Sequence, residues 1–230
     1  ATSPYVVQLN TSSAPFDDQR AREAIYYATD AEAIRVGVFN SRYPISQAFT
    51  APGGRFHVDV VPGYRGYAPE RARAIVDELG GLRITLGTLR SAVAEQIVTA
   101  LQSQWRRVGI DVEIEVYDIA RLVQEFQSGH WHAMLQTAGS FDPEAVSGVS
   151  SRFRSDRPFT GVKDRVLDDL LERAAGTFDE EKRARLYAEA ARHISDRAYA
   201  AFLLAYAPAQ LSRGTLEGPG LTTPRQRPGM

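Results

Sequence analysis

The 230-residue chain contains no cysteine, and only two of its 27 lysine and arginine residues are lysines. Without cysteine it can form no disulfide, no thiolate zinc or iron–sulfur centre and no cysteine nucleophile. The arginines are interleaved with acidic residues, and the formal net charge is −1. Because a nucleic-acid-binding surface needs clustered basic side chains, we expect no nucleic-acid partner.

Long hydrophobic runs and catalytic motifs are also missing. No apolar run approaches the roughly 20 residues that a bilayer requires, so we predict no membrane span, and no signal sequence is recognisable. There is no Gly-x-Gly-x-x-Gly or Walker A motif, and Gly139-Ser140-Phe141 lacks the second glycine of a nucleophile elbow. Neighbouring carboxylates such as Asp168 and Asp169 fall on amphipathic helical patterns, where a solvated face is expected. We therefore predict no enzyme activity and no cofactor.

What the sequence does contain is an alternation of strand and helix patterns. Residues 82–89 and 110–116 alternate apolar with polar side chains, which is typical of strands. The apolar stripe of a helix lies between them, and a second helix and a strand-like run follow over 118–137. Strands joined by helices favour right-handed βαβ crossovers. The sequence therefore predicts an α/β fold with a mixed sheet, βαβ units and flanking helices.

The rest of the chain is mainly helical. Helical patterns cover residues 15–25, 28–34, 67–80, 164–175 and 179–196, and strand patterns cover 5–9 and 199–206. The first two helices follow each other end to end. Residues 40–66 are rich in glycine, proline and tyrosine and show little periodicity, which predicts a long loop of a kind that often carries function.

Seven short motifs follow one another between residues 5 and 213: PFDD at 15–18, DAEAI at 30–34, YAPERA at 67–72, QWRRVGIDV at 104–112, SGHWH at 128–132, DP at 142–143 and YAEA at 187–190. Each motif alone is weakly specific, but their common order is informative. With these motifs the chain resembles the C-terminal portion of the peptide, nickel and opine class of ABC-transporter solute-binding proteins, called family 5.

The resemblance implies a periplasmic-binding-protein-like (type II) lobe. Residues 14–198 would form the C-terminal lobe, and residues 1–13 and 199–213 would cross from and back to a missing N-terminal lobe, with a flexible tail over 214–230. The implied protein is extracytoplasmic, either periplasmic or anchored as a lipoprotein. It would capture a peptide-like or other small solute, an oligopeptide being one such solute, between two lobes and deliver it to ABC permease subunits in the membrane. The alternative is a solute-sensing domain of a transcription regulator that uses the same fold.

Peptide binders of this family carry a tryptophan at a strand end and then an aspartate that pairs with the peptide's ammonium group. In this sequence Thr137 and Ser140 stand near those two positions, and Phe141 and Asp142 follow. Asp142 is a candidate ammonium partner, since a buried ammonium needs a carboxylate. Because Pro143 comes next, Asp142 is more simply explained as the cap of a helix, and a cap at the mouth of a cleft can also bind a solute.

Two further segments supply candidate solute contacts. The long loop contains Tyr43, Ser46, Gln47 and Phe49, which can stack on a solute and hydrogen-bond to it. Phe153 and Phe159 lie in a segment that is near the cleft in the family. The simpler explanation for the aromatic residues of the long loop, Tyr43 and Phe49, is that they anchor that loop to the core.

The histidines do not form a convincing metal site. His130 and His132 are two residues apart in SGHWH, a spacing that puts both on one face of a strand without a third ligand. His57 and His193 are isolated in the sequence. We therefore predict no metal ligands and no catalytic residues.

Overall fold

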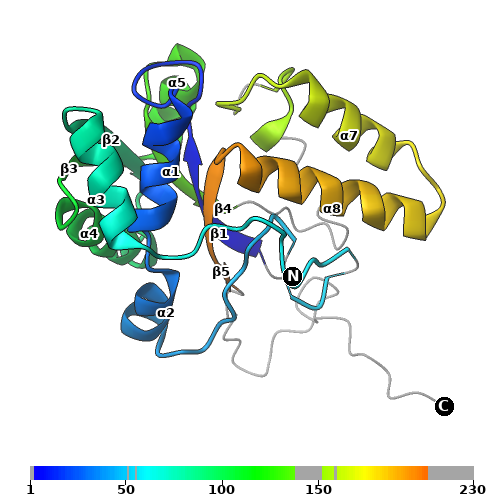
Figure 1. Cartoon of the computed structure of the whole chain (residues 1–230), viewed down its shortest axis with the longest axis horizontal. Coiled ribbons are helices and arrows are strands. Elements are labelled where there is room, and N and C mark those ends of the chain that lie inside the picture. The colour runs from blue at the N-terminus through cyan, green and yellow to red at the C-terminus, as the bar shows by residue number, and fades with distance from the viewer. Residues whose placement is uncertain (1–2, 51, 55, 138–151, 158–159, 207–230) are drawn as a thin grey trace, which may run out of the picture.

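The computed structural model describes residues 3–50, 52–54, 56–137, 152–157 and 160–206, and a five-stranded sheet runs through its centre (Figure 1). The strand order is β3-β2-β4-β1-β5. Strand β2 (Leu82–Leu89) pairs in parallel with β3 (Ile110–Tyr117) and with β4 (Ala133–Thr137). Strand β1 (Ser3–Leu9) pairs antiparallel with β4 and with β5 (Ala200–Tyr206). The predicted mixed sheet is therefore confirmed.

Two helices connect the parallel strands. Helix α4 (Ala92–Arg106) joins β2 to β3, and α5 (Ile119–Ser128) joins β3 to β4. Both βαβ units were predicted from the apolar periodicity. Strand β4 begins two residues later than the sequence pattern suggests. Just before it, the carbonyl of Trp131 accepts a hydrogen bond from Asn10 Nδ2 at 2.8 Å, and the carbonyl of His132 accepts one from the amide of Asn10 at 2.9 Å.

The two N-terminal helices follow each other directly, as predicted. In α1 (Gln19–Ala28) the carboxylate of Asp18 accepts a hydrogen bond from the amide of Arg20, and in α2 (Ala31–Phe39) Asp30 accepts one from Ala33. Each aspartate satisfies an amide that lacks an intrahelical partner. Helix α3 (Pro69–Glu78) begins without a side-chain cap because Ala68 precedes it.

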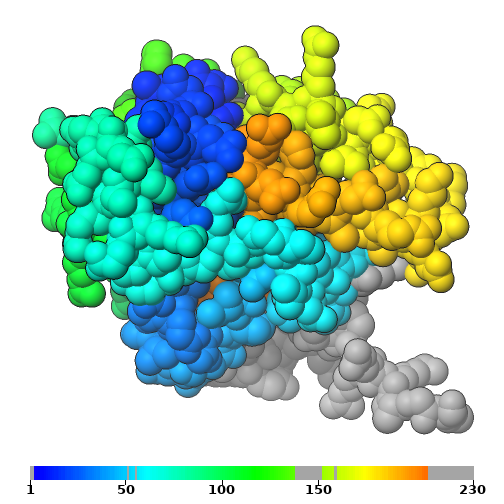
Figure 2. Space-filling view, in the orientation of Figure 1, coloured from blue at the N-terminus to red at the C-terminus, as the bar shows by residue number. Residues whose placement is uncertain are grey.

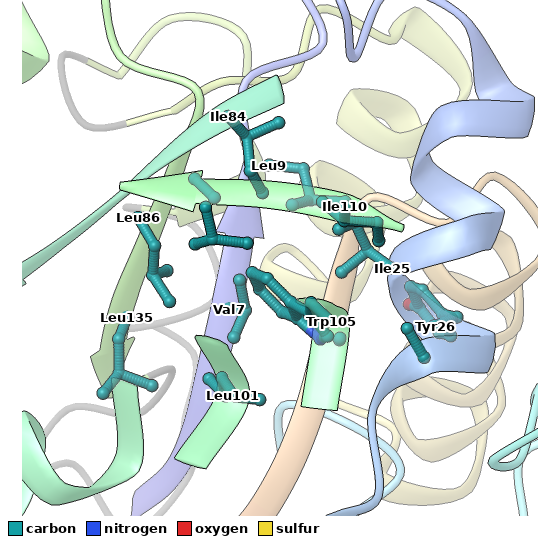
Figure 3. Close-up of a cluster of buried hydrophobic side chains, with 14 of the residues drawn as sticks. Val7, Leu9, Ile25, Tyr26, Ile84, Leu86, Leu101, Trp105, Ile110 and Leu135 are labelled. Atoms are coloured by element: carbon teal, nitrogen blue, oxygen red, sulfur yellow. The ribbon is translucent and has the colours of Figure 1, made fainter. Parts of the chain in front are cut away.

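Alternation along the inner strands separates two apolar clusters, one on each face of the sheet. Val7 and Leu9 point to the face covered by α1 and α4, where Trp105 is fully buried and donates to Thr29 Oγ1 at 3.0 Å (Figure 3). Val6 points to the other face, which α7 (Arg165–Ala175) and α8 (Glu180–Asp196) cover. The fold therefore has three layers, with the sheet between two groups of helices (Figure 1).

The segment between α2 and α3 contains no helix and no named strand among its described residues, in agreement with the predicted loop. Ile45 forms an isolated bridge with Leu204, and the amide of Ser46 donates to the carbonyl of Leu203. The loop is thus attached to the outer edge of β5. Its later part, cyan in Figure 2, lies between α3 and α8 on the face shown there.

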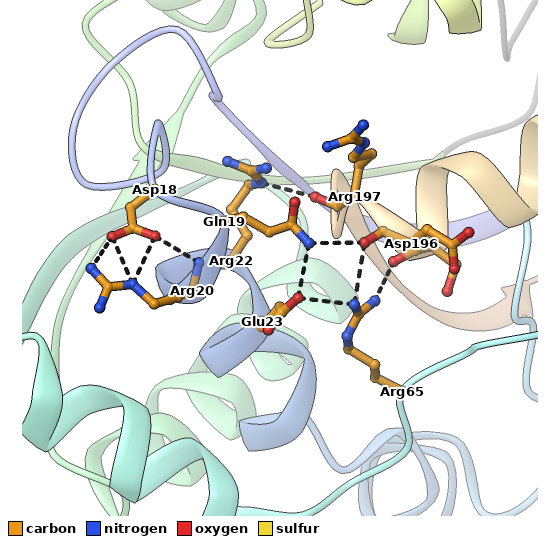
Figure 4. Close-up of polar contacts among 9 residues, drawn as sticks. Asp18, Gln19, Arg20, Arg22, Glu23, Arg65, Asp196 and Arg197 are labelled. Carbon is orange, nitrogen blue, oxygen red and sulfur yellow. Dashed lines mark hydrogen bonds and ion pairs between the residues drawn. The ribbon is translucent and has the colours of Figure 1, made fainter.

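A polar cluster joins α1 to the end of α8 (Figure 4). Arg22 is buried, and its guanidinium donates to the carbonyls of Phe16 and Arg197 at 2.6 and 3.0 Å. Arg65 donates to the carbonyl of Ser195 at 2.5 Å and pairs with Glu23 at 2.9 Å. Carbonyls at the end of a helix favour positive charge, so these arginines stabilise the contact between two layers of the fold.

Candidate functional site

A hollow of about 230 Å³ lies where the parallel strands β2 and β4 end. Helices α4 and α5 and strand β1 complete its wall. The residues that line it are Tyr5, Thr88, Leu89, Ser91, Ala94, Leu122, Leu135, Gln136, Thr137 and Arg152. In open α/β sheets, ligands bind in crevices outside the carboxyl ends of the strands. This hollow is therefore the candidate solute site.

Strand register brings the polar side chains of the hollow together. Thr88 of β2 lies beside Leu135 of β4, and Thr137, two residues further, lies beside Tyr5 of β1. Residues two apart share a face of a sheet, so these four side chains lie on the face that α4 covers. Thr88 is only 1% exposed, and its Oγ1 has no hydrogen-bond partner. A buried hydroxyl without a partner is costly, which makes Thr88 a candidate for binding a ligand.

The first turn of α4 forms another part of the wall. Ser91 is the N-cap residue, but its side chain accepts no hydrogen bond from the helix. The first amides of a helix have no intrahelical acceptor, and the helix dipole makes this end positive. Since Ser91 and Ala94 both line the hollow, the beginning of α4 borders it.

Two glutamines hold Arg152 against the end of the sheet. Gln136 Nε2 donates to Gln8 Oε1 at 2.7 Å, and Gln8 Nε2 donates to the carbonyl of Arg152 at 2.9 Å. Gln8 is fully buried, so this chain of bonds fixes the backbone of Arg152 beside the hollow. Burial lowers the pKa of the Arg152 guanidinium to about 10, so the group keeps its positive charge at neutral pH.

An aromatic cluster places the predicted site residue Tyr43 near the hollow. The ring of Tyr43 lies 5.2 Å from that of Tyr206 and 5.4 Å from that of Phe39, between centroids. Tyr206 in turn lies 5.3 Å from Tyr5, which lines the hollow. Burial raises the pKa of Tyr5 to about 12, and the two neighbouring tyrosines add to the effect. Tyr43 therefore supports the wall of the hollow through Tyr206.

Ser46, Gln47 and Phe49, the other predicted contacts in the long loop, pack that loop together. Ser46 Oγ donates to the carbonyls of Ala48 and Thr50, and Gln47 Oε1 accepts a bond from the amide of Val61. Phe49 is 2% exposed and belongs to the apolar cluster beneath α8. None of these three residues lines the hollow at β2 and β4.

The remaining predicted contacts are placed as follows. Thr137 lines the hollow. Phe153 is fully buried and packs against Phe202, with ring centroids 6.4 Å apart. Ser140, Phe141, Asp142 and Phe159 lie outside the described residues.

The sequence interpretation missed Thr88, Ser91, Arg152 and Tyr5. A signal was present, since Thr88 stands at the end of the predicted strand 82–89 and Ser91 at the start of the next helix. Strand ends are where ligands bind in such sheets. What the sequence did not give is the strand order, which brings these residues next to Thr137 and Tyr5.

Other sites in the described part of the chain are less convincing. No group of three potential metal ligands was found among the described residues, and His132 Nδ1 accepts a hydrogen bond from the amide of Thr85 at 3.0 Å. A polar hollow of about 470 Å³ runs along β3, but its Gln102 and Arg106 side chains donate to the carbonyl of Val112. These bonds cap the edge of a strand. Within the described residues, no helix combines the length and apolar character needed to cross a bilayer.

A model of the bacterial extracellular solute-binding proteins, family 5 middle, matches residues 1–159 of the chain. The dipeptide-binding protein of Escherichia coli is 25% identical over 213 residues, which cover 84% of this chain and 38% of that protein. Heme-binding protein A of Haemophilus influenzae is 25% identical and covers 80% of this chain and 36% of its own length. The nickel-binding periplasmic protein of E. coli is 23% identical, with 84% and 41% covered.

Solved structures show the same fold. A dipeptide-binding protein from Pseudoalteromonas in complex with Met-Leu aligns with a TM-score of 0.79 and 19% identity, covering 89% of this chain and 43% of that one. The protein MoaA from A. tumefaciens R10 in complex with mannopinic acid aligns with a TM-score of 0.80 and 18% identity, again covering 89% and 43%. The chain thus spans less than half the length of these relatives.

Proposed function

Since this chain belongs to the bacterial extracellular solute-binding proteins, family 5, we propose that it forms one lobe of a two-lobed receptor for a small solute. The receptor works outside the cytoplasm, and it presents a peptide-like or other small solute to the membrane subunits of an ABC importer. The lobe contributes binding and no catalysis. Dipeptide-, heme- and nickel-binding proteins among the relatives support the solute-binding role.

One observation carries the proposal of two lobes. Ser3 at the start of β1 lies in register with Tyr206 at the end of β5, so the chain enters and leaves the sheet side by side. Tyr5, two residues further along β1, lines the hollow and pairs with Thr137. A second lobe that continues from both strands would therefore stand directly over the hollow. Residues 1–13 and 199–213 would be the segments that cross between the lobes.

Enclosure by a second lobe explains why one lobe offers only a shallow part of a site. Binding sites for small molecules usually bury 70–90% of the ligand's surface. A solute that contacts both lobes binds their closed arrangement more tightly than the open one, and so shifts the population toward it. The permease would then recognise the closed form.

The proposal is tested by screening the full-length protein for thermal stabilisation by dipeptides, nickel ions and heme, the classes that the relatives are named for. A solute at 100 times its dissociation constant should add about 2.7 kcal/mol to the free energy of unfolding. The substitution Thr137→Trp places a large side chain in the hollow. It should abolish the thermal stabilisation by any solute that stabilises the parent protein.

The matched control is Thr99→Trp, which places the same side chain on the exposed face of α4, away from the hollow. We expect it to bind the solute as the parent does. Equal binding by the Thr137→Trp variant would mean that the solute sits elsewhere. If dipeptides, nickel ions and heme all fail to stabilise the protein, the proposal of a receptor for these solute classes is contradicted.

A further inference from the structure

His132 lies where two parts of the sheet are joined by few backbone contacts. Strand β2 pairs with β3 along its whole length, but it pairs with β4 only from Leu86 to Thr88. The seam between β2 and β4 is therefore the shortest of the sheet, and it connects β3 and β2 to the other three strands. His132 immediately precedes Ala133, the residue of β4 at which this seam begins.

The ring of His132 extends the seam beyond the strand. Its Nδ1 accepts a hydrogen bond at 3.0 Å from the amide of Thr85, the residue of β2 that precedes Leu86. On the other side, the carbonyl of His132 accepts a hydrogen bond from the amide of Asn10, which follows β1. The imidazole thus adds one hydrogen bond between β2 and the start of β4, while the backbone of the same residue is held to the end of β1.

The bond to Thr85 exists only while Nδ1 carries no hydrogen. A neutral imidazole has one donor and one acceptor nitrogen, so an acceptor at Nδ1 places the hydrogen on Nε2. In the protonated ring both nitrogens carry hydrogens, and Nδ1–H would then face the N–H of Thr85. Protonation therefore removes the acceptor of this amide, and a half-buried donor without a partner costs free energy.

The surroundings of the ring favour its neutral form. His132 is half-buried, and burial lowers its pKa from the ordinary value of 6.5, while Glu115 of β3 acts in the opposite direction. Among the described residues, the other titratable side chains on this face of β2 and β3, on α5 and on the histidine's own segment are Arg83, Asp111, Glu113, Tyr117, Arg121, Glu125 and His130. Arg83 pairs with Asp111, and Arg121 pairs with Glu125.

We propose that His132 is a pH-sensitive latch between β2 and β4, closed by the neutral ring and opened at the Thr85 amide when the ring is protonated. Because the ring is half-buried, rotation about χ1 can turn the protonated side chain toward water. Opening weakens the seam whose other end, at Thr88, borders the hollow. The latch needs no solute, so it holds or fails independently of the receptor function.

The direction of the pH dependence follows from the lowered pKa of His132. Above 6.5 the ring is neutral in the open and the closed latch, so the latch contributes fully to stability. Below 6.5 the open form binds a proton more readily, and the contribution declines until the pH has passed the lower pKa of the closed form. We expect opening to increase by about fivefold in total, which corresponds to the loss of one hydrogen bond.

Amide hydrogen exchange of the ¹⁵N-labelled 230-residue chain, followed by NMR at pH 7 and pH 5, tests the latch. After correction for the intrinsic exchange rate, the protection of the Thr85 amide should fall by about fivefold, whereas that of the β5 amides should stay the same. A long-range ¹H–¹⁵N correlation should place the hydrogen of the neutral His132 ring on Nε2. A hydrogen on Nδ1, or a change at Thr85 no larger than that in β5, would overturn the proposal.

Variants at two histidines assign the effect to the ring. In His132→Asn the amide oxygen can accept the bond from Thr85 but does not titrate, so the protection of Thr85 should be equal at both pH values. His132→Leu removes the acceptor and should give low protection at both. His130→Asn is the matched control, because His130 is exposed and lies in the same segment, and it should keep the pH dependence of the parent. Persistence of that dependence in His132→Asn, or its loss in His130→Asn, would contradict the latch.

Discussion

At the scale of single residues, Asp164 joins three elements through one carboxylate. Its Oδ1 accepts hydrogen bonds from the amides of Val166 and Leu167 at the start of α7. Its Oδ2 lies 2.7 Å from both His193 Nε2 of α8 and the hydroxyl of Tyr199 before β5. Burial alone would raise the pKa of Asp164, but these hydrogen bonds outweigh it and lower the pKa to about 2.

The lowered pKa predicts how stability depends on pH. The ionised carboxylate is favoured in the folded state, so its contribution is complete above the unfolded pKa of 3.8 and is lost as the pH falls toward 2. Asp164→Ala should reduce the free energy of unfolding at pH 7 by about 2–3 kcal/mol, since it removes a cap and leaves two donors without their acceptor. Urea denaturation at pH 7 and between pH 4 and 2 measures both effects.

Asp118→Ala is the matched control, because Asp118 caps α5 through a single bond to the amide of Arg121. It should cost about 1 kcal/mol. In the Asp164→Ala variant the decline of stability below pH 4 should be smaller than in the parent. An equal decline in the parent and in the Asp164→Ala variant would show that other carboxylates cause the loss of stability at low pH.

Asp164 also shows what sequence patterns give and what they omit. The helix that starts at residue 164 was predicted from its apolar spacing, and the structure confirms it as α7. The bond to His193 was not predicted, because 29 residues separate the two side chains and nothing in the pattern encodes the packing of α7 on α8. His193 looked isolated in the sequence for the same reason.

At the scale of elements, the close approach of β1 to the segment before α7 depends on Gly161. A Cβ atom at this position would lie 2.7 Å from Asn10 Cα, from the carbonyl oxygen of Leu9 and from the ring of Trp131. Two of these three neighbours belong to the backbone, which cannot move away without disturbing β1. The amide of Thr11 also donates to the carbonyl of Gly161 at 2.7 Å, so the two segments are held together.

We therefore predict that Gly161→Ala lowers the free energy of unfolding by about 1–3 kcal/mol through overpacking. Gly37→Ala is the control, because Gly37 lies inside α2 and a Cβ there would meet nothing within 4 Å. Alanine is the better helix former, so this variant should gain up to about 1 kcal/mol. Thermal unfolding of both variants tests the pair. A neutral effect at position 161 would mean that β1 and this segment can separate freely.

Much of the fold could be predicted at this scale, and much of the site could not. Helices and strands with a regular spacing of apolar residues could be located in the sequence to within a few residues, because the one buried face of each element determines that spacing. Phe49 and Phe153 show the limit, since an aromatic residue in an irregular segment has the same sequence signal whether it anchors the loop or contacts a solute. Thr88 needed the strand order as well, and strand order is set by contacts between residues far apart in the chain.

At the scale of the whole molecule, the position of the hollow determines how strongly one lobe can bind. The hollow lies at the end of the sheet where Ser3 and Tyr206 are side by side. The residues of this chain form one wall of the hollow, and in the proposed receptor the second lobe forms the opposite wall. A closed site buries 70–90% of a small ligand, whereas one lobe can cover only part of it. Affinity should therefore depend on the presence of both lobes.

We predict that the full-length protein binds its solute at least about 100-fold more tightly than the 230-residue chain, which corresponds to about 2.7 kcal/mol. Calorimetric titration of both proteins with the solute identified by the thermal screen provides the comparison. Because each face of the sheet already has its own apolar cluster, the 230-residue chain should fold without the second lobe, and a cooperative thermal transition without solute checks this. Sub-micromolar binding by the 230-residue chain would contradict the two-lobe proposal, since the lobe would then contain a complete site.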